Sequence, residues 1–389
     1  MNILLFTSAM IDKDFAEYQN EAKIKPNPSN QNFYSKLIKA LALYNKVAVI
    51  SLRPFVKGMF YKNSLPEEEK ECGNVKFYYA KVDIRKKYKL FNEKTEIIKC
   101  AQKAIDDFRS HDFICITDTL RPNLVKAAKR ISEMYVRKVV GMLTDNPYNL
   151  SNVSNTYIKT IKKSVSKLDG YLTLTSKLVD VFDPEKPFYM FEGLACDEEY
   201  FKRNPIYDYY FFAGSLYERY GVKNMVDAFH NSSIKAKLVI AGSGPLTDYI
   251  NKMSIDDYRI LFLTQLSKDK IISYEKNAIV NINPRPLNSA IDSESVPSKL
   301  IEYLASGVPT ISTKYPSFYK IFKDNVYWIE GNDISSLKKA LESFEKEPKE
   351  IAQKKAQTAR AKAFEFYGLD VQGESITHFL DAISSSKRS

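Results

Sequence analysis

The segment 281–313, NINPRPLNSAIDSESVPSKLIEYLASGVPTIST, constrains the fold more than any other part of the chain. Its pattern predicts a strand over 278–282, a polar loop that ends at Glu294, and then a helix. Pro297 can start this helix because the fixed φ of proline suits a first helical turn. Gly307 can take the left-handed position at the helix end, and residues 308–312 restart as a buried strand. Apolar side chains share one helical face: Val296, Leu300, Ile301 and Leu304. The segment therefore predicts half of a βαβ unit.

Two carboxylates flank the predicted start of this helix. Glu294 precedes it, and Glu302 lies two turns further on, roughly 12 Å away at 1.5 Å per residue. The free N–H groups of residues 296–300 and the helix dipole favour a diphosphate, and Lys299 adds a positive charge beside it. One carboxylate can then reach a sugar and the other a ribose.

The spacing Glu294-x7-Glu302 resembles the signature of retaining glycosyltransferases with the GT-B fold, above all glycosyltransferase family 4. The stretch PSKLIEYLASGVPTIS is similar to the P-S-K-x-x-E-Y-x-A-x-G-x-P pattern of bacterial members that build surface polysaccharides. The resemblance implies that Glu302 binds the ribose and Glu294 the donor sugar. It assigns the diphosphate to the backbone of Ser295, Val296, Pro297, Ser298 and Lys299. The alternative is an ordinary amphipathic helix with two surface glutamates.

A second element, FFAGSLYERYGVKNMVDAF at 211–229, reads as a strand that ends in glycine and a helix that follows it. It resembles the family's G-R-L-x-x-x-K-G element, in which a glycine admits a phosphate and the Arg and Lys neutralise it. Gly214 and Gly221 keep their places, but Ser215 replaces the Arg and Tyr220 replaces the Lys. The charge must then come from another cation, and Arg285 is the best candidate among Arg219, Lys223, Arg285 and Lys299.

Two further strands follow in the order that the family shows. Residues 237–244, KLVIAGSG, predict a buried strand closed by a turn at Gly242 and Gly244, and residues 260–266 predict the next one. By the resemblance, Thr264 should lie near the base of a nucleotide. Strands and helices that alternate in this way indicate a parallel doubly wound sheet, whose ligands bind at the carboxyl ends of the strands. Gly214, Gly242, Thr264 and Glu294 all fall at such ends.

The first half of the chain shows the same α/β alternation. Strands are predicted over 2–7, 46–52, 75–82, 112–117, 139–144 and 170–175, and a helix over 33–43. No G-x-G-x-x-G follows Thr7, which argues against a dinucleotide. The polar stretch 13–32 is predicted as a long loop, and the resemblance implies that it faces the acceptor.

The length of 389 residues suits two domains. We predict an N-terminal acceptor-binding domain at 1–200, a nucleotide-sugar-binding domain at 201–366 and a terminal helix at 367–389. The charged stretch 196–207 is the expected break. In the GT-B fold that the resemblance implies, two Rossmann-like domains face a central cleft and the terminal helix crosses back to the first domain.

Positive charge is concentrated in the first half. Residues 1–170 hold 30 Lys and Arg against 18 Asp and Glu, and the remainder holds 28 against 29. The run KVDIRKKYKLF at 81–91 interleaves basic and apolar side chains, which favours an anionic membrane surface as a partner. A solvated loop explains the run equally well. No nucleic-acid motif is present.

Other patterns exclude classes of function. The four cysteines have no metal-ligand spacing, and the plain interpretation is reduced thiols in a cytoplasmic protein. Neither a signal peptide nor a run of 18 apolar residues occurs. No D-x-D motif stands at a suitable strand end. We therefore expect no metal and no cofactor, with the nucleotide-diphosphate sugar as donor substrate.

The expected mechanism follows from the charge on a leaving diphosphate. Lys299, Arg285 and the helix N-terminus would stabilise that charge, and the resemblance implies that the leaving phosphate takes the acceptor proton. Many family members carry a histidine where this chain has Asp118. Asp118, in TDTLRP, and Asp145, in TDNPYN, are therefore candidates for the acceptor side, with helix N-caps as the alternative.

These patterns predict a retaining glycosyltransferase that moves a hexose-type sugar to a glycan or lipid-linked acceptor in surface polysaccharide or glycoconjugate synthesis. One alternative is a degenerate GT-B subunit that positions a catalytic partner, which the loss of the usual Arg and Lys favours. Another is an epimerase that acts on the nucleotide sugar, but it needs a second carboxylate or histidine around the sugar, and the sequence offers no candidate.

Overall fold

The computed structural model describes residues 1–389 except 27, 86–88, 151–152, 197–207, 288–296 and 387–389. Two compact units divide the chain. The first comprises Met1–Leu194 and the C-terminal residues from Leu369, and the second comprises the described residues of Ala195–Asp292 and Pro297–Gly368. The expected break at 196–207 lies almost entirely outside the described residues.

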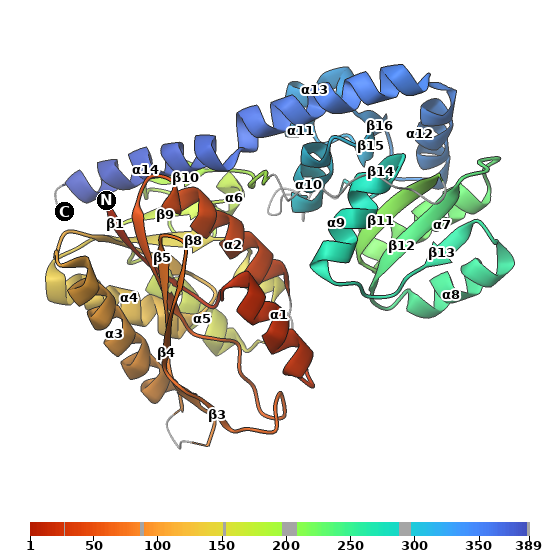
Figure 1. Ribbon diagram of the computed structural model, residues 1–389. Coiled ribbons are helices and arrows are strands. Elements are labelled where there is room, and N and C mark those ends of the chain that lie inside the picture. The colour runs from red at the N-terminus through yellow and green to blue at the C-terminus, as the bar shows by residue number, and fades with distance from the viewer. Residues whose placement is uncertain (27, 86–88, 151–152, 197–207, 288–296, 387–389) are drawn as a thin grey trace. The chain divides into compact units, whose positions relative to one another are not determined.

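The first unit is built on an eight-stranded sheet, with helices packed on it (Figure 1). The strand order is β10-β9-β8-β7-β1-β2-β5-β4, and only the pair β4–β5 is antiparallel. A short antiparallel pair, β3 with β6, stands beside it. The strands are β1 Asn2–Thr7, β2 Lys46–Ser51, β3 Ser64–Leu65, β4 Glu68–Cys72, β5 Val75–Tyr79, β6 Val82–Asp83, β7 Ile114–Asp118, β8 Val139–Leu143, β9 Gly170–Thr173 and β10 Phe188–Met190.

All helices of this unit except the terminal helix lie between strands along the chain. The helices are α1 Asp12–Glu21, α2 Pro28–Ala42, α3 Lys89–Phe108, α4 Pro122–Tyr135, η1 Pro147–Asn149, α5 Asn155–Val165, α6 Ser176–Asp180 and α14 Leu369–Ser385. The terminal helix α14 packs on α2. A Cβ added at Gly373 would meet the carbonyl oxygen of Ala40 at 2.3 Å, so a glycine is required at this crossing. The amide of Asn45 donates to Thr377 at 2.8 Å. The expected return of the last helix to the first unit is confirmed.

The six strands predicted for the first half are present within one to three residues of the expected ends. The loop predicted over 13–32 is wrong, because that stretch forms α1 and the start of α2. Phe15 and Tyr18 lie three residues apart and are both buried, so the helix has an apolar side that its polar composition concealed. The antiparallel strand β4 was not predicted because four of its five side chains are exposed.

The second unit has a six-stranded parallel sheet in the order β13-β12-β11-β14-β15-β16. Its strands are β11 Tyr209–Ser215, β12 Lys237–Ser243, β13 Ile260–Phe262, β14 Val280–Asn283, β15 Thr310–Thr313 and β16 Tyr327–Ile329. The helices are η2 Glu218–Tyr220, α7 Val222–His230, α8 Thr247–Asp256, α9 Lys268–Asn277, α10 Ser298–Ser306, α11 Pro316–Phe322, η3 Lys323–Asn325, α12 Ile334–Lys346 and α13 Lys349–Tyr367. Helices lie on both faces of this sheet (Figure 1).

The segment 281–313 forms the predicted strand, helix and strand as β14, α10 and β15. Pro297 stands at the N-cap position, just before the first helical residue Ser298. Gly307 has a φ of 73°, the left-handed conformation that ends the helix. Three of the four predicted facing positions, Leu300, Ile301 and Leu304, are buried. Val296 lies outside the described residues.

Candidate functional site

The strand order of the second unit has a reversal point between β11 and β14. From β11 the chain adds β12 and β13 on one side, then returns to place β14 on the other. In open parallel sheets such a point leaves a crevice at the carboxyl ends of the two strands, where ligands bind. Gly214 and Ser215 end β11, and Asn283 ends β14. The candidate donor site therefore lies at this edge.

Glycines let the backbone of β11 and β12 come together at this edge. Gly214 pairs with Gly242 and Ser215 with Ser243 in the parallel register. Gly242 has a φ of 149°, and an added Cβ would meet the carbonyl oxygen of Gly214 at 1.9 Å. Gly244 has a φ of 159°, and an added Cβ would meet the carbonyl oxygen of Leu216 at 2.7 Å. Larger residues cannot occupy these two positions without moving the strand ends.

Thr264 continues the same edge after β13. Its φ is 54°, a left-handed conformation that is uncommon outside glycine, and its carbonyl oxygen accepts from the N–H of Gly242 at 2.7 Å. The turn is therefore fixed against the neighbouring strand end. Thr264, Gly242 and Gly214 line the carboxyl edge together, as expected from the sequence.

An ion-paired cluster lies at the start of α10. The Nζ of Lys299 is 2.7 Å from the Oε2 of Glu302 and 3.4 Å from the Oε2 of Glu275 in α9. Burial by itself would lower the pKa of Lys299, but the two carboxylates outweigh it and raise the pKa above its usual value. Lys299 therefore stays charged and holds Glu302 from one side.

Tyr303 attaches this cluster to the edge of β11. Its side chain is fully buried, and its hydroxyl accepts from the N–H of Ala213 at 3.1 Å. Ala213 directly precedes Gly214. Helix α10, which carries Glu302 one residue before Tyr303, is thus attached to the glycine end of the central strand.

The remaining cation candidates separate into two groups. Lys223 is 2.8 Å from Asp227 one turn along α7, so a carboxylate already neutralises it. Arg219 and Arg285 instead both lie against Tyr220, with guanidinium carbons 5.0 and 5.6 Å from the ring centroid. Arg219 also lies 4.9 Å from the centroid of Tyr217. The residue that replaces the family's Lys is the one that both arginines contact.

The first unit has its own reversal point, between β1 and β7. Asp118 ends β7 and is 3% exposed. Its carboxylate accepts from the N–H of Leu120 at 3.0 Å and from the amide of Asn30, which also donates to Ser8 after β1 at 3.0 Å. Burial raises the pKa of Asp118, against the opposing effect of Arg121 at 3.9 Å.

Asp118 does not cap a helix, because α4 begins only at Pro122 and Arg121 holds its N-cap position. Asp145 is exposed, and the cap that follows it is made by Asn146, whose side chain accepts from the N–H of Tyr148 at 3.0 Å. Neither acid therefore has the N-cap role that was its alternative. Asp118 lies at the carboxyl end of β7, and Asp145 lies two residues after that of β8.

The structure describes only part of the segment 294–298 that was predicted to bind the donor. Glu294, Ser295 and Val296 lie outside the described residues, so the structure does not place the first carboxylate of the signature. Pro297 is buried and Ser298 is exposed at the start of α10.

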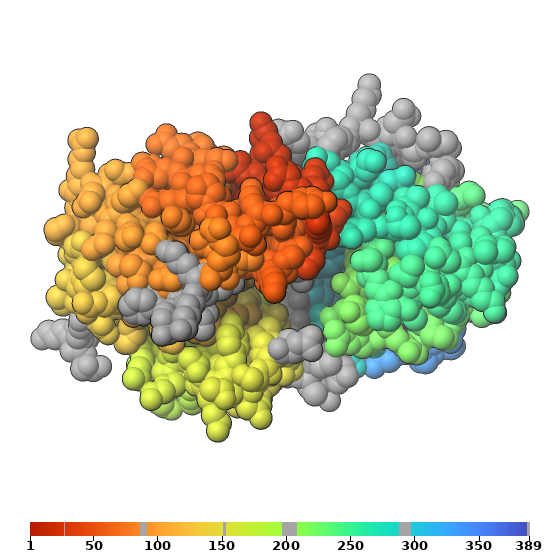
Figure 2. All heavy atoms as spheres, turned by 90° about the horizontal axis from the view of Figure 1, so that it is seen from below, coloured from red at the N-terminus to blue at the C-terminus, as the bar shows by residue number. Residues whose placement is uncertain are grey.

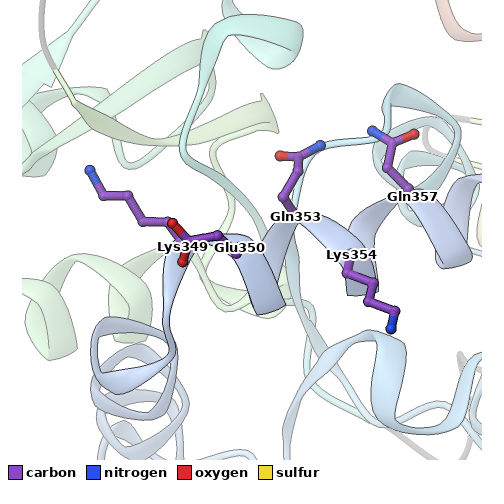
Figure 3. Close-up of a pocket in the computed structure, with 5 residues that line it drawn as sticks. All are labelled: Lys349, Glu350, Gln353, Lys354 and Gln357. Atoms are coloured by element: carbon purple, nitrogen blue, oxygen red, sulfur yellow. The ribbon is translucent and has the colours of Figure 1, made fainter.

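A shallow hollow of about 460 Å³ lies elsewhere, along the first turns of α13 (Figure 3). It is lined by Lys349, Glu350, Gln353, Lys354 and Gln357. Gln353 and Gln357 donate to the carbonyl of Gly307, which precedes β15, so the hollow is at the amino ends of the strands. It is on the wrong edge of the sheet for the donor site.

Within the described part of the chain, no group of three or more His, Cys, Asp or Glu side chains could hold a metal ion. The helices described here include none long and apolar enough to cross a membrane.

The sequence did not indicate several residues that lie near the carboxyl ends of the strands in the two sheets. Glu275 reads as a solvated helix position, and only the packing of α9 against α10 brings it to Lys299. Asn30 lies in the stretch that was predicted as a loop. Tyr34 is fully buried in α2, and its hydroxyl has no hydrogen-bond partner within the described part of the protein. The sequence marked Tyr220 only as the replacement for a lysine. Its contact with Arg219 and Arg285 appears only in the structure.

Comparison with known proteins agrees with this geometry. Residues 197–363 match the family model described as glycosyl transferases group 1. Sucrose-phosphate synthase from Thermosynechococcus elongatus superposes with a TM-score of 0.67 at 13% identity, covering 99% of this chain and 100% of that one. HepE of Anabaena in complex with UDP gives 0.60 at 12%, covering 98% and 100%. An α,α-trehalose 6-phosphate synthase from Burkholderia multivorans gives 0.63 at 10%, covering 100% and 99%.

The curated proteins contain no match to this sequence. The structural likeness extends over the whole chain, and the fold is that of GT-B glycosyltransferases, with two Rossmann-like domains. The family match covers the unit that carries the glycine edge and Glu302. Fold and family match together support a GT-B glycosyltransferase.

Proposed function

We propose that the protein is a retaining glycosyltransferase that moves a hexose-type sugar from a nucleotide-diphosphate sugar to a glycan or lipid-linked acceptor. The observation that supports the proposal is the start of α10, where Lys299 pairs with Glu302 and where the Tyr303 hydroxyl accepts from the N–H of Ala213, the residue before Gly214. A fixed carboxylate suits ribose hydroxyls, and glycine backbone suits a phosphate that approaches closely.

A uridine nucleotide is the proposed donor group. HepE, which shares the fold, has been crystallised with UDP and with UDP-glucose. In our proposal the base lies against the turn at Thr264, the ribose against Glu302, and the diphosphate between Gly214, Arg285 and the start of α10. Glu294 would contact the sugar hydroxyls, as the family resemblance implies.

The chemistry proposed for this site is stabilisation of the leaving diphosphate. Cleavage of the sugar–phosphate bond leaves negative charge on the phosphate oxygens, and cations with backbone N–H groups lower the energy of that state. Lys299 contributes through Glu302, which it holds at 2.7 Å. We propose a metal-independent reaction, so saturating EDTA should leave turnover unchanged, whereas a strict Mg²⁺ requirement would contradict this part of the proposal.

On the acceptor side we propose Asp118 and Asp145, with synthesis of surface polysaccharide or glycoconjugate as the setting. Burial raises the pKa of Asp118. Its oxygens can accept hydrogen bonds from sugar hydroxyls.

A cytoplasmic protein that docks at the inner face of the membrane would suit a lipid-linked acceptor. The proposal rests on the basic excess of residues 1–170 and on two loops of the first unit, after α1 and after β2, that lie side by side (Figure 2). The N–H of Lys23 donates to the carbonyl of Met59 at 2.9 Å, and the Nζ of Lys23 is 3.5 Å from the ring centroid of Tyr61. Exposed basic and apolar side chains lie together there: Lys23, Ile24, Lys25, Val56, Lys57, Tyr61 and Lys62. Within the basic run at 81–91, the guanidinium of Arg85 forms an ion pair with the carboxylate of Asp83 at 3.0 Å.

The deciding experiment is a panel of nucleotide sugars screened by thermal stabilisation of the full chain. A donor at 100 times its Kd should add about 2.7 kcal/mol to the free energy of unfolding, whereas mismatched nucleotides should add much less. Radiolabelled transfer from the stabilising donor, with the anomeric configuration of the product read by NMR, then tests the retaining outcome.

The two alternatives predict different results in the same assays. A degenerate subunit would show no stabilisation by any nucleotide sugar and no transfer. An epimerase would convert the nucleotide sugar without any acceptor. Release of UDP that depends on an added acceptor would contradict both.

A further inference from the structure

We propose that Tyr220 is an aromatic platform that holds Arg219 and Arg285 as a joint diphosphate subsite. The two arginines would supply the positive charge that is lost where Ser215 and Tyr220 replace the family's Arg and Lys. This inference rests on the proposed function, since it names the residues that would hold the leaving diphosphate of the donor.

The location of the three side chains is the first argument. Arg219 and Tyr220 lie in the loop after β11, and Arg285 lies in the loop after β14. These two strands are neighbours in the sheet and flank its reversal point. The platform therefore stands at the crevice where a doubly wound sheet receives its ligand.

The contacts with the ring are the second argument. The guanidinium carbons of Arg219 and Arg285 lie 5.0 and 5.6 Å from the Tyr220 centroid, both inside the range of cation–π attraction. Two like charges around one ring repel each other, so the arrangement gains most when an anion with several oxygens joins them. A guanidinium also offers paired N–H donors that match phosphate geometry.

The backbone fixes both arginines before any ligand arrives. Gly221 has a φ of 72°, and a Cβ there would meet the carbonyl oxygen of Pro284 at 2.1 Å, so glycine allows the two loops to touch. The Tyr315 hydroxyl donates to the carbonyl of Arg285 at 2.9 Å.

Asn332 secures the Arg285 loop at Leu287. Its side chain accepts from the N–H of Leu287 at 2.9 Å and donates to the carbonyl of Leu287 at 2.8 Å. Asn224 in α7 donates in turn to the carbonyl of Asn332 at 3.0 Å. The loop that carries Arg285 is therefore held to the helix that follows the platform, which places the two charges without cost at the moment of binding.

The other two cations of this edge are engaged by carboxylates. Lys223 pairs with Asp227, and Lys299 pairs with Glu302 and Glu275. In the part of the chain that the structure describes, Arg219 has no carboxylate within ion-pair distance. Arg219 can therefore contribute its positive charge to a diphosphate at the platform.

The test compares the affinities of the full-length protein for UDP, uridine and inorganic pyrophosphate by calorimetry. Tyr220→Leu should weaken UDP and pyrophosphate about tenfold or more and leave uridine within a factor of about two. Tyr220→Phe, which keeps the ring, should restore most of the affinity. Arg219→Ala and Arg285→Ala should each weaken both phosphate ligands, and after Tyr220→Leu their further effect should shrink because the three act as one unit.

Lys223→Ala is the matched control, since it removes one positive charge from the same region at a residue that Asp227 neutralises. It should change UDP affinity by less than about twofold. Unchanged UDP and pyrophosphate binding in Tyr220→Leu, or an equal loss in Tyr220→Phe, would overturn the inference. Pyrophosphate binding that depends on Tyr220 without stabilisation by any nucleotide sugar would support the subsite and contradict the proposed donor.

Discussion

Lys299 and Glu302 form an ion pair of 2.7 Å between Nζ and Oε2, one turn apart in α10. The cation of the signature helix therefore holds the carboxylate of the same helix. Glu275, whose side chain is 8% exposed, secures Lys299 from α9 at 3.4 Å. Lys299, secured by Glu275, holds Glu302, so a substitution at either should change how Glu302 binds its ligand.

Glu302→Ala should weaken UDP binding by about 1.5 to 3 kcal/mol, the value of a hydrogen bond to a charged group. The loss should also appear for the nucleotide sugar, because the ribose is common to both. Calorimetry of the two ligands measures it, with Glu342→Ala, a half-buried glutamate on α12, as the control. An unchanged affinity for both ligands would remove Glu302 from the ribose site.

Lys299→Met should destabilise the protein by about 2 kcal/mol, because it leaves two neighbouring carboxylates without their shared cation. UDP affinity should fall as well, since Glu302 loses its support. Adding Glu275→Gln should recover part of the stability by removing one of the repelling charges. Denaturant unfolding and calorimetry of the single and double variants measure both effects. A single variant as stable as the parent would show that the ion pair contributes nothing.

Turnover tests the cations in a different way. Arg285→Ala and Lys299→Ala should each lower kcat/KM about tenfold or more, a loss of about 1.4 kcal/mol in transition-state stabilisation. Arg285→Lys should recover less than half of the loss, because an ammonium lacks the planar fork of a guanidinium. Full activity in the Arg285→Ala/Lys299→Ala variant would mean that Arg219 and backbone groups hold the diphosphate without them.

Asp257 should contribute to the pH dependence of stability of the second unit. The side chain of Arg259 is the main cause that lowers the pKa of Asp257 to about 2, and His230 adds to it. Because this pKa is depressed on folding, its contribution is present above pH 4 and is lost as the pH falls toward 2. Asp257→Asn should cost about 2 kcal/mol at pH 7 and flatten the decline between pH 4 and 2. Thermal unfolding across this range checks both, and an unaltered slope would contradict the assignment.

Membrane docking should depend on salt and on charge in the first unit. Each Lys or Arg near an anionic surface is worth roughly 1 kcal/mol, and salt screens the attraction. Binding to phosphatidylserine vesicles should fall steeply with added salt, and also when Arg85, Lys86, Lys87 and Lys89 are changed to Gln. Changing Lys23, Lys25, Lys57 and Lys62 to Gln should weaken it similarly. Four exposed lysines of the second unit serve as the control of equal charge: Lys339, Lys346, Lys349 and Lys354. Failure to bind such vesicles at low salt would favour a soluble or protein acceptor.

Much of the second unit could be predicted from the sequence alone. The strand, helix and strand of 281–313, the left-handed Gly307 and the glycine ends of β11 and β12 all follow from local patterns. Apolar periodicity and the conformational ranges of glycine and proline are properties of neighbouring residues, so they can be read without the fold. The same residues support the family resemblance, which correctly implied the GT-B fold.

Only the tertiary structure decided which distant side chains meet. Arg285 reaches Tyr220 because β14 pairs with β11, a choice of strand order that no local pattern encodes. Lys299 pairs with Glu275 because α9 packs against α10, and the polar stretch after β1 is helical because Phe15 and Tyr18 find a core to enter. The sequence by itself determined the elements and the glycines of the site. The packing of those elements determined the charges around it, since Coulomb and cation–π energies depend on distances that only the folded chain sets.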